Sequence, residues 1–137
     1  MSKIVVLAHD SQKPSLLSFL KDKQSWFFGR EIVATGRSAD LFEAGGVELS
    51  LQHVKKGSEG GYLEIIDMIK ANDISMVFFF RDPSIVQPYH QDILDLIDAC
   101  DYKNVPIATN QSAAELLIIG KIRMEAASSV SERVLRN

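Results

Sequence analysis

The sequence predicts an α/β fold, in which a mostly parallel sheet of five strands carries helices on both faces. Short continuous apolar runs recur along the chain, as is typical of strands buried on both faces of a parallel sheet. The segments between these runs are long enough for one helix each, which is the spacing of successive strand–helix–strand units. The predicted strands cover residues 3–8, 31–34, 47–51, 75–80 and 105–108.

Each segment between the strands carries apolar residues at helical offsets, so one face of each predicted helix would pack on the sheet. The third strand alternates Val47, Leu49 and Leu51 with polar residues, which predicts an edge strand with one face in water. Residues 121–137 are weakly patterned, and we interpret them as a terminal helix. The helical stripes are Leu16, Leu17 and Leu20; Leu63, Ile66 and Ile69; Ile93, Leu94 and Ile97; and Ala113, Leu116 and Leu117.

Length and composition indicate one compact domain over residues 1–137. The chain has a mass of 15.2 kDa and 46% apolar residues, enough for a core that needs neither disulfides nor metal. The lone Cys100 excludes an internal disulfide, and the Cys and His residues are too few and too scattered for a structural zinc site. We therefore expect no metal, and a reducing, cytoplasmic location.

Charge and hydropathy exclude several classes of partner. The net charge of −3 is spread without acidic or basic blocks, so we expect neither nucleic acid nor an anionic membrane as a partner. The longest apolar runs, residues 4–8 and 76–80, are far shorter than the roughly 20 residues that span a membrane. The N-terminus also lacks the apolar stretch of a secretory signal. Any anion-binding site must therefore be local.

The loop after the second predicted strand, residues 34–38, has the composition of an anion cradle. Its backbone N–H groups, the hydroxyls of Thr35 and Ser38 and the guanidinium of Arg37 would surround a phosphate at a helix N-terminus. A simpler interpretation is that Thr35 and Ser38 cap the following helix while Arg37 faces solvent. The loop alone does not decide between the two.

Polar side chains also follow the other predicted strands. Asp10 and Lys13 follow the first strand, Asp82 follows the fourth, and His90 and Asp92 lie near the start of a later helix. Each has an alternative interpretation as a helix cap, a turn residue or a surface charge. However, a parallel sheet would bring all these loops to one edge, and capping alone does not predict that shared edge. The convergence indicates a ligand site.

Five segments carry a resemblance to a known family: VLAHDSQK at 6–13, ATGRS at 34–38, GSEGG at 57–61, FFRDP at 79–83 and VPIATN at 105–110. In order and spacing they resemble the methylglyoxal synthase family, over residues 3 to about 118. The resemblance implies a Rossmann-like three-layer sandwich and a cytoplasmic homohexamer with no metal or organic cofactor. It also implies a carbon–oxygen lyase that converts dihydroxyacetone phosphate to methylglyoxal and inorganic phosphate.

The resemblance also implies roles for individual residues. In that chemistry a carboxylate removes a proton next to the ketone, an imidazole stabilises the enediolate, and phosphate leaves by β-elimination. Arg37 stands where the family usually has a small hydroxyl residue, so it would either add a phosphate contact or crowd the phosphate. The matching catalytic positions are His9, Asp10, Asp82 and Asp92, and the matching phosphate-binding positions are Lys13, Thr35, Ser38 and the backbone at Gly57.

Two positions depart from the family's pattern. Tyr62 follows the paired glycines where the family has its catalytic aspartate, and an ordinary tyrosine is ionised only to about one part in 1,000 at pH 7. Glu59 or Glu64 would then have to serve as the base. Tyr89 falls at the position of the catalytic imidazole, and His90 reaches it only after a shift of one residue.

Two functions therefore compete at the level of sequence. The first is the lyase reaction that the resemblance implies. The second is a catalytically impaired module that binds inorganic phosphate or a phosphorylated metabolite for regulation. The missing aspartate at Tyr62 is the feature that separates them.

Overall fold

A computed structural model describes residues 2–46, 49–86 and 88–136, and it confirms the predicted α/β architecture. Five strands form one sheet in the order β3-β2-β1-β4-β5, and every strand pair is parallel. The strands are β1 (Lys3–Ala8), β2 (Glu31–Thr35), β3 (Ser50–Val54), β4 (Ile74–Phe80) and β5 (Ile107–Ala108).

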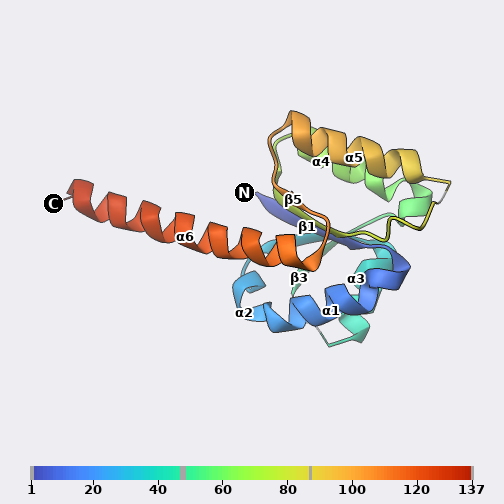
Figure 1. The fold of residues 1–137 in the computed structure, drawn as a ribbon, viewed down its shortest axis with the longest axis horizontal. Coiled ribbons are helices and arrows are strands. Elements are labelled where there is room, and N and C mark those ends of the chain that lie inside the picture. Colours follow the sequence, from blue (N-terminus) through green and yellow to red (C-terminus); the bar gives the residue numbers. More distant parts are fainter. Residues whose placement is uncertain (1, 47–48, 87, 137) are drawn as a thin grey trace.

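Helices cover both faces of the sheet, as Figure 1 shows. One layer contains α1 (Lys13–Asp22), α2 (Gln24–Phe27), α3 (Gly36–Ala44) and the start of α6 (Gln111–Arg136). The opposite layer contains α4 (Gly61–Lys70) and α5 (His90–Tyr102). Two short 3-10 turns, η1 (Asp10–Gln12) and η2 (Gly57–Glu59), lie in loops after strands.

The core is divided in two by the sheet because successive strand side chains point to opposite faces. In β4, Phe78 and Phe80 pack with α1, α2 and α6, whereas Phe79 packs with α4 and α5. All three rings are at most 2% exposed. The continuous apolar run of this strand is thus explained by burial on both faces.

Two predicted strands differ from the structure by more than one residue at an end. The third strand was expected at residues 47–51, but β3 is Ser50–Val54, and residues 47 and 48 lie outside the described residues. Its register against β2, from Glu31 with Ser50 to Thr35 with Val54, sets these limits, and its predicted position at the sheet edge is confirmed. The fifth strand shortens because Pro106 has no N–H to donate, although its carbonyl accepts a hydrogen bond from the Val77 N–H at 2.9 Å.

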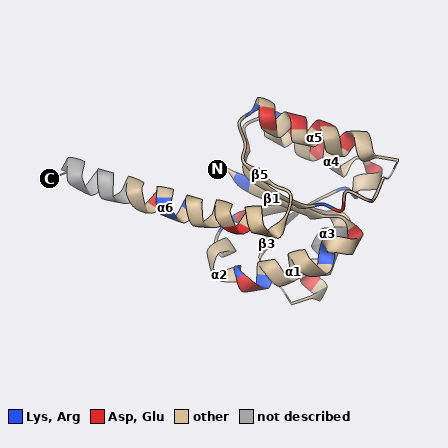
Figure 2. Ribbon diagram, in the orientation of Figure 1, with Lys and Arg blue, Asp and Glu red and all other residues tan. Residues whose placement is uncertain are grey.

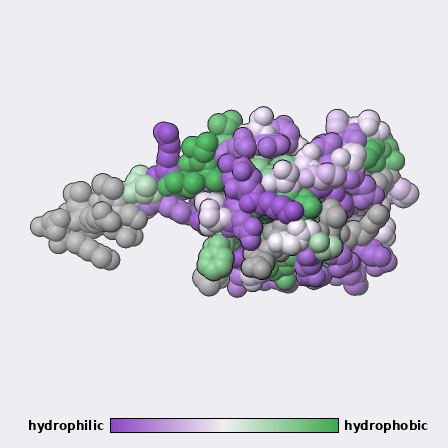
Figure 3. Space-filling view, turned by 90° about the horizontal axis from the view of Figure 1, so that it is seen from below, coloured by the Kyte–Doolittle hydropathy of each residue, from purple (hydrophilic) through white to green (hydrophobic). Residues whose placement is uncertain are grey.

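The predicted terminal helix is confirmed for residues 121–136, and it is the continuation of α6, which begins at Gln111. The helix extends well beyond the body of the molecule (Figure 1). Figure 3 shows apolar surface gathered where α6 leaves the body, and Leu116, Ile119, Ile122 and Met124 are each at least 47% exposed. Within the described part of the chain, no helix is both long and apolar enough to cross a membrane.

Charged residues of both signs are distributed over the described ribbon, with acidic side chains concentrated along α5 (Figure 2). Asp92, Asp95, Asp98 and Asp101 repeat at intervals of three residues on this helix. Residues three apart lie near one another on a helix, so each of these carboxylates is close to the next one along α5.

The parallel order of the strands brings four loops to one edge of the sheet. Ala8 at the end of β1 is in register with Phe80 at the end of β4, and Thr35 at the end of β2 is in register with Val54 at the end of β3. The loops that follow these strands therefore emerge side by side. This edge is where the predicted site residues converge.

Among the glycines whose surroundings the structure describes, we expect Gly61 to be the least replaceable. A Cβ on Gly61 would overlap the backbone carbonyl oxygen of Lys55, and a backbone group cannot move away easily. We predict that Gly61→Ala lowers the free energy of unfolding by about 1–3 kcal/mol, measured by urea denaturation.

The matched control is Gly120→Ala in α6, where a Cβ would meet no atom within 4 Å. This change should raise stability by about 0.5–1 kcal/mol because alanine is the better helix former. Equal stability of Gly61→Ala and wild type would contradict the close approach of α4 to Lys55.

Candidate functional site

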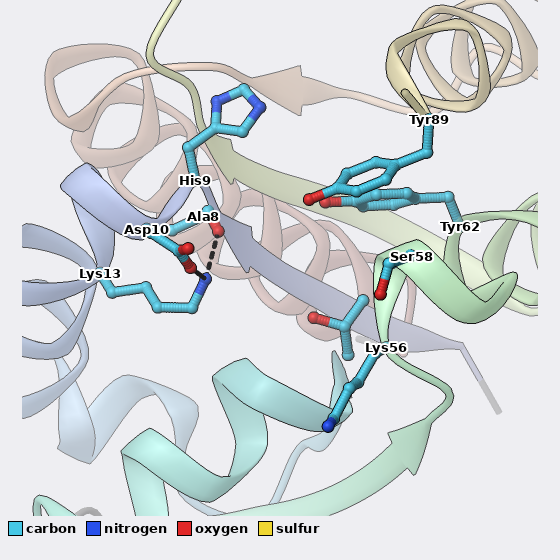
Figure 4. Close-up of a pocket in the computed structure, with 10 residues that line it drawn as sticks. Ala8, His9, Asp10, Lys13, Lys56, Ser58, Tyr62 and Tyr89 are labelled. Atoms are coloured by element: carbon cyan, nitrogen blue, oxygen red, sulfur yellow. Dashed lines mark hydrogen bonds and ion pairs between the residues drawn. The ribbon is translucent and has the colours of Figure 1, made fainter. Parts of the chain in front are cut away.

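A small cavity lies at the edge of the sheet where the four loops meet. Its volume is about 30 Å³, and it is walled by side chains from the ends of β1 and β2, the loop around η2, and the starts of α4 and α5. Figure 4 shows these side chains around the opening. The lining residues are Ala8, His9, Asp10, Lys13, Thr35, Lys56, Gly57, Ser58, Tyr62 and Tyr89.

Lys13 is fixed at one side of the cavity by two contacts. Its Nζ donates a hydrogen bond to the Ala8 carbonyl oxygen at 2.8 Å and lies 3.0 Å from Asp10 Oδ1 (Figure 4). The Lys13 side chain is only 15% exposed, whereas that of Asp10 is 50% exposed. The η1 turn and the first residue of α1 thus place a carboxylate and an ammonium together at the cavity.

His9 is buried and is held in one orientation by the loop after β4. The Asp82 N–H donates a hydrogen bond to His9 Nδ1 at 2.8 Å, so the neutral ring carries its proton on Nε2. Burial and the nearby positive charge of Arg81 lower the pKa of His9 below its ordinary value of 6.5. Among the described residues, buried Nε2 has no hydrogen-bond partner. His9 therefore offers the cavity wall a neutral imidazole.

Asp82 organises its own loop and does not line the cavity. Its carboxylate accepts hydrogen bonds from Ser11 Oγ at 2.7 Å and from the Ser84 N–H at 3.0 Å, and Ser84 Oγ donates a further one. These bonds, led by those from the two serine hydroxyls, lower the pKa of Asp82. Asp82 thus joins the loops after β1 and β4, and its backbone orients His9.

Tyr62 fills one wall of the cavity. The ring is 6% exposed and stacks on Phe79, with ring centroids 5.8 Å apart and an interplanar angle of 14°. Its edge lies directly over Gly57, where a Cβ would collide with it. Burial, followed by the neighbouring Tyr89 and Asp10, raises the pKa of Tyr62 above its ordinary value of 10. The phenol is therefore neutral, a hydrogen-bond donor and no base at physiological pH.

Tyr89 packs against the ring of Tyr62. Their ring centroids are 5.6 Å apart, and the rings are tilted by 36°. In Figure 4 both hydroxyl groups point in the same direction, toward Ala8 at the end of β1. Phe79, Tyr62 and Tyr89 thus form a three-ring stack, which we call the tyrosine stack, along one side of the cavity.

The structure brings together only part of the predicted site. His9, Asp10, Lys13, Thr35, Gly57 and Tyr62 all line the cavity, and the predicted convergence holds for them. Arg37 and Ser38 lie on the first turn of α3, and their side chains are outside the described part of the structure.

Three predicted catalytic residues, Asp82, His90 and Asp92, do not line the cavity. His90 is the first residue of α5, and its Nδ1 is buried without a hydrogen-bond partner among the described residues. Tyr89 lies at the cavity in its place. Asp92 lies in the first turn of α5, where it complements the helix dipole.

Neither glutamate beside Tyr62 reaches the cavity wall. Glu59 is exposed on η2. Glu64 accepts a hydrogen bond from the Lys55 N–H at 3.1 Å and lies 3.9 Å from Lys55 Nζ. Among the described residues that line the cavity, Asp10 is the one carboxylate.

Sequence reasoning missed Lys56 and Ser58. Both line the cavity, and they flank Gly57, which was predicted to contribute its backbone. The signal that could have found both residues is their place beside Gly57. A backbone that surrounds an anion also carries the adjacent side chains toward it. In the described parts of the chain, no three His, Cys, Asp or Glu side chains lie close enough to hold a metal ion.

The lowered pKa of His9 predicts an acid-sensitive fold. Below pH 6.5 the unfolded chain takes up a proton at His9 more readily than the folded chain, where a proton on Nδ1 would face the Asp82 N–H. Stability should therefore fall as the pH drops through 6.5 toward the lower folded pKa. We expect His9→Asn to flatten the change in thermal midpoint between pH 7.5 and 5.5.

The matched control is His53→Asn, which changes a half-exposed histidine on β3 that pairs with Glu43 at 2.8 Å. This control should lose less of the wild-type pH dependence than His9→Asn does. Identical slopes for the wild type and His9→Asn would contradict the assignment.

Comparison with known proteins gives one consistent result. An MGS-like domain matches residues 16–109. The methylglyoxal synthase of Carboxydothermus hydrogenoformans is 40% identical over 86% of this chain and 97% of its own length, and that of Acholeplasma laidlawii is 37% identical over 85% and 94%. The crystal structure of methylglyoxal synthase from Elizabethkingia anophelis superposes with a TM-score of 0.78 at 30% identity, over 85% of this chain and 76% of that one. The chain therefore belongs to the methylglyoxal-synthase-like domain family.

Proposed function

We propose that this protein binds inorganic phosphate or a small phosphorylated metabolite at the cavity and does not efficiently catalyse the lyase reaction of its relatives. The observation that carries the proposal is the position of Tyr62. A buried, neutral phenol occupies the wall from which a carboxylate would have to act, beside an otherwise cationic and hydroxyl-rich cavity.

The binding half of the proposal rests on the groups that face the cavity. Lys13 and Lys56 supply two ammonium groups from different elements, and Thr35 and Ser58 supply hydroxyls. The N-terminus of α3 begins at Gly36, next to Thr35, and helix N-termini favour anions. Such charge-assisted donors suit the oxygens of a phosphate group.

The proposed loss of catalysis is inferred from the tyrosine stack, which stands where the reaction would need a base. Proton abstraction next to a ketone needs a base whose pKa is near the working pH, and the pKa of Tyr62 is raised above 10. The carboxylate of Asp10 pairs with the Lys13 ammonium at 3.0 Å, and this ion pair favours its remaining a hydrogen-bond acceptor over its acting as the base. Loss of general acid–base catalysis typically costs about 10²–10⁴ in rate.

The names of the relatives favour a second function, the methylglyoxal synthase reaction itself. On that hypothesis Asp10 would have to replace the missing base, because Glu59 and Glu64 do not line the cavity. The deciding experiment is titration calorimetry with phosphate, together with a colorimetric methylglyoxal assay on dihydroxyacetone phosphate. The enzyme from Carboxydothermus hydrogenoformans is the reference.

We expect phosphate binding together with turnover at least about 100-fold below that of the reference enzyme. Lys56→Met should weaken phosphate binding by about 10–100-fold, the value of one charge-assisted hydrogen bond. Lys55→Met is the matched control, because its neighbouring ammonium does not line the cavity. An equal loss of phosphate affinity in both variants would show that Lys56 acts only through general surface charge. Turnover equal to that of the reference enzyme would refute the proposal.

Restoring the reaction should require both tyrosines to be replaced. We predict that Tyr62→Asp alone gains little activity, because Tyr89 lies at the cavity where the imidazole is needed. The double variant Tyr62→Asp with Tyr89→His should gain about 10²–10⁴ in kcat/KM on dihydroxyacetone phosphate.

Tyr102→Asp is the control for an added carboxylate, since Tyr102 is 90% exposed at the end of α5. A full gain from Tyr62→Asp alone would show that an imidazole other than one at position 89 serves the reaction.

A further inference from the structure

The cavity is much smaller than an ordinary metabolite site. Its volume of about 30 Å³ is roughly a tenth of the ~300 Å³ at which small-molecule pockets begin. A compact ion whose oxygens all face the wall fits such a space. A ligand with a carbon chain needs additional room in at least one direction.

The tyrosine stack forms one wall of the cavity and leaves no room for a carbon chain on that side. The Tyr62 ring packs against both Phe79 and Tyr89, and its edge rests on Gly57. Displacing this ring would expose a side chain that is now 94% buried. It would also remove the stacking partner of Phe79. The ring is therefore a fixed wall of the site.

The same stack contributes polar groups that suit an ion. Both tyrosine hydroxyls point toward the end of β1, where Lys13 and Asp10 lie (Figure 4). A phenolic O–H donates one hydrogen bond. Tyr62 and Tyr89 can therefore each donate to an oxygen of the ion, while their rings take up the room that a carbon chain would need.

Asp10 adds a condition on the protonation state of the ion. An ionised carboxylate accepts hydrogen bonds and donates none. Phosphate retains a proton near pH 7 and can donate it to Asp10 while its other oxygens accept from Lys13 and Lys56. Sulfate has no proton, so its oxygens would face the carboxylate without a hydrogen bond, and this repulsion opposes binding.

We infer that the cavity selects free inorganic phosphate, as a protonated tetrahedral oxyanion, over phosphate esters and over sulfate. This inference rests on the proposed function, and it narrows the ligand from any phosphate-bearing molecule to the ion itself. The tyrosine stack provides the selection against esters, and Asp10 provides the selection against sulfate.

The test is competitive titration calorimetry at pH 7 with inorganic phosphate, sulfate, dihydroxyacetone phosphate and glycerol 3-phosphate. We expect phosphate to bind at least about tenfold more tightly than each of the other three. If no anion binds, the proposed function itself fails. If either ester binds as tightly as phosphate, the inference fails while the proposed function stands.

Two variants assign the selection to its residues. Tyr89→Ala opens the half-buried side of the stack and should raise the affinity for both esters at least about tenfold relative to phosphate. Tyr62→Ala should do the same where it folds, and Tyr102→Ala, far from the cavity, should change neither ratio. Unchanged ratios in folded Tyr89→Ala would overturn the role of the stack.

Asp10→Asn tests the second selection with little change of shape. The amide can donate to an oxyanion, so the preference for phosphate over sulfate should fall at least about tenfold. The preference for phosphate over the esters should remain, because the tyrosine stack is intact. Retained discrimination against sulfate would overturn the role of Asp10.

Discussion

The central pairing of β1 with β4 is the constraint on which the site depends. Six residue pairs join these strands, from Lys3 with Ile74 to Ala8 with Phe80, and both strands are buried on both faces. Because the pairing is parallel, the two chains leave the sheet at the same edge. This proximity allows the Asp82 N–H to orient His9 and Ser11 to bind the Asp82 carboxylate.

The second determinant is Phe79, which connects the core to the cavity. Its ring belongs to the layer between the sheet and helices α4 and α5, and it also supports Tyr62 and lies 5.3 Å from the ring of His9. An aspartate at position 62 would stack on nothing, whereas a tyrosine extends the core outward. Tyr62 therefore joins the packing of the core to the wall of a cavity that Lys13 and Lys56 also line.

Much of the fold could be predicted from the sequence because buried parallel strands are continuous apolar runs, as at residues 3–8. The limits of β3 could not, since they depend on register with β2 and not on the pattern of Val47 to Leu51. In the site, the positions of Lys13 and Thr35 follow from strand order alone. Whether Tyr89 or His90 lies at the cavity depends on the residue at which α5 begins. The spacing of the motif does not fix that residue.

We propose that the tyrosine stack fills the space that the carbon chain of a triose phosphate would need. Crystal structures of this protein grown with saturating phosphate and with saturating dihydroxyacetone phosphate test this proposal. We predict a phosphate ion between Lys13 and Lys56 in the first structure, and in both structures Tyr62 packed on Phe79 as it is without ligand. A triose carbon chain lying where the Tyr62 ring now lies, with the ring turned away, would contradict the account.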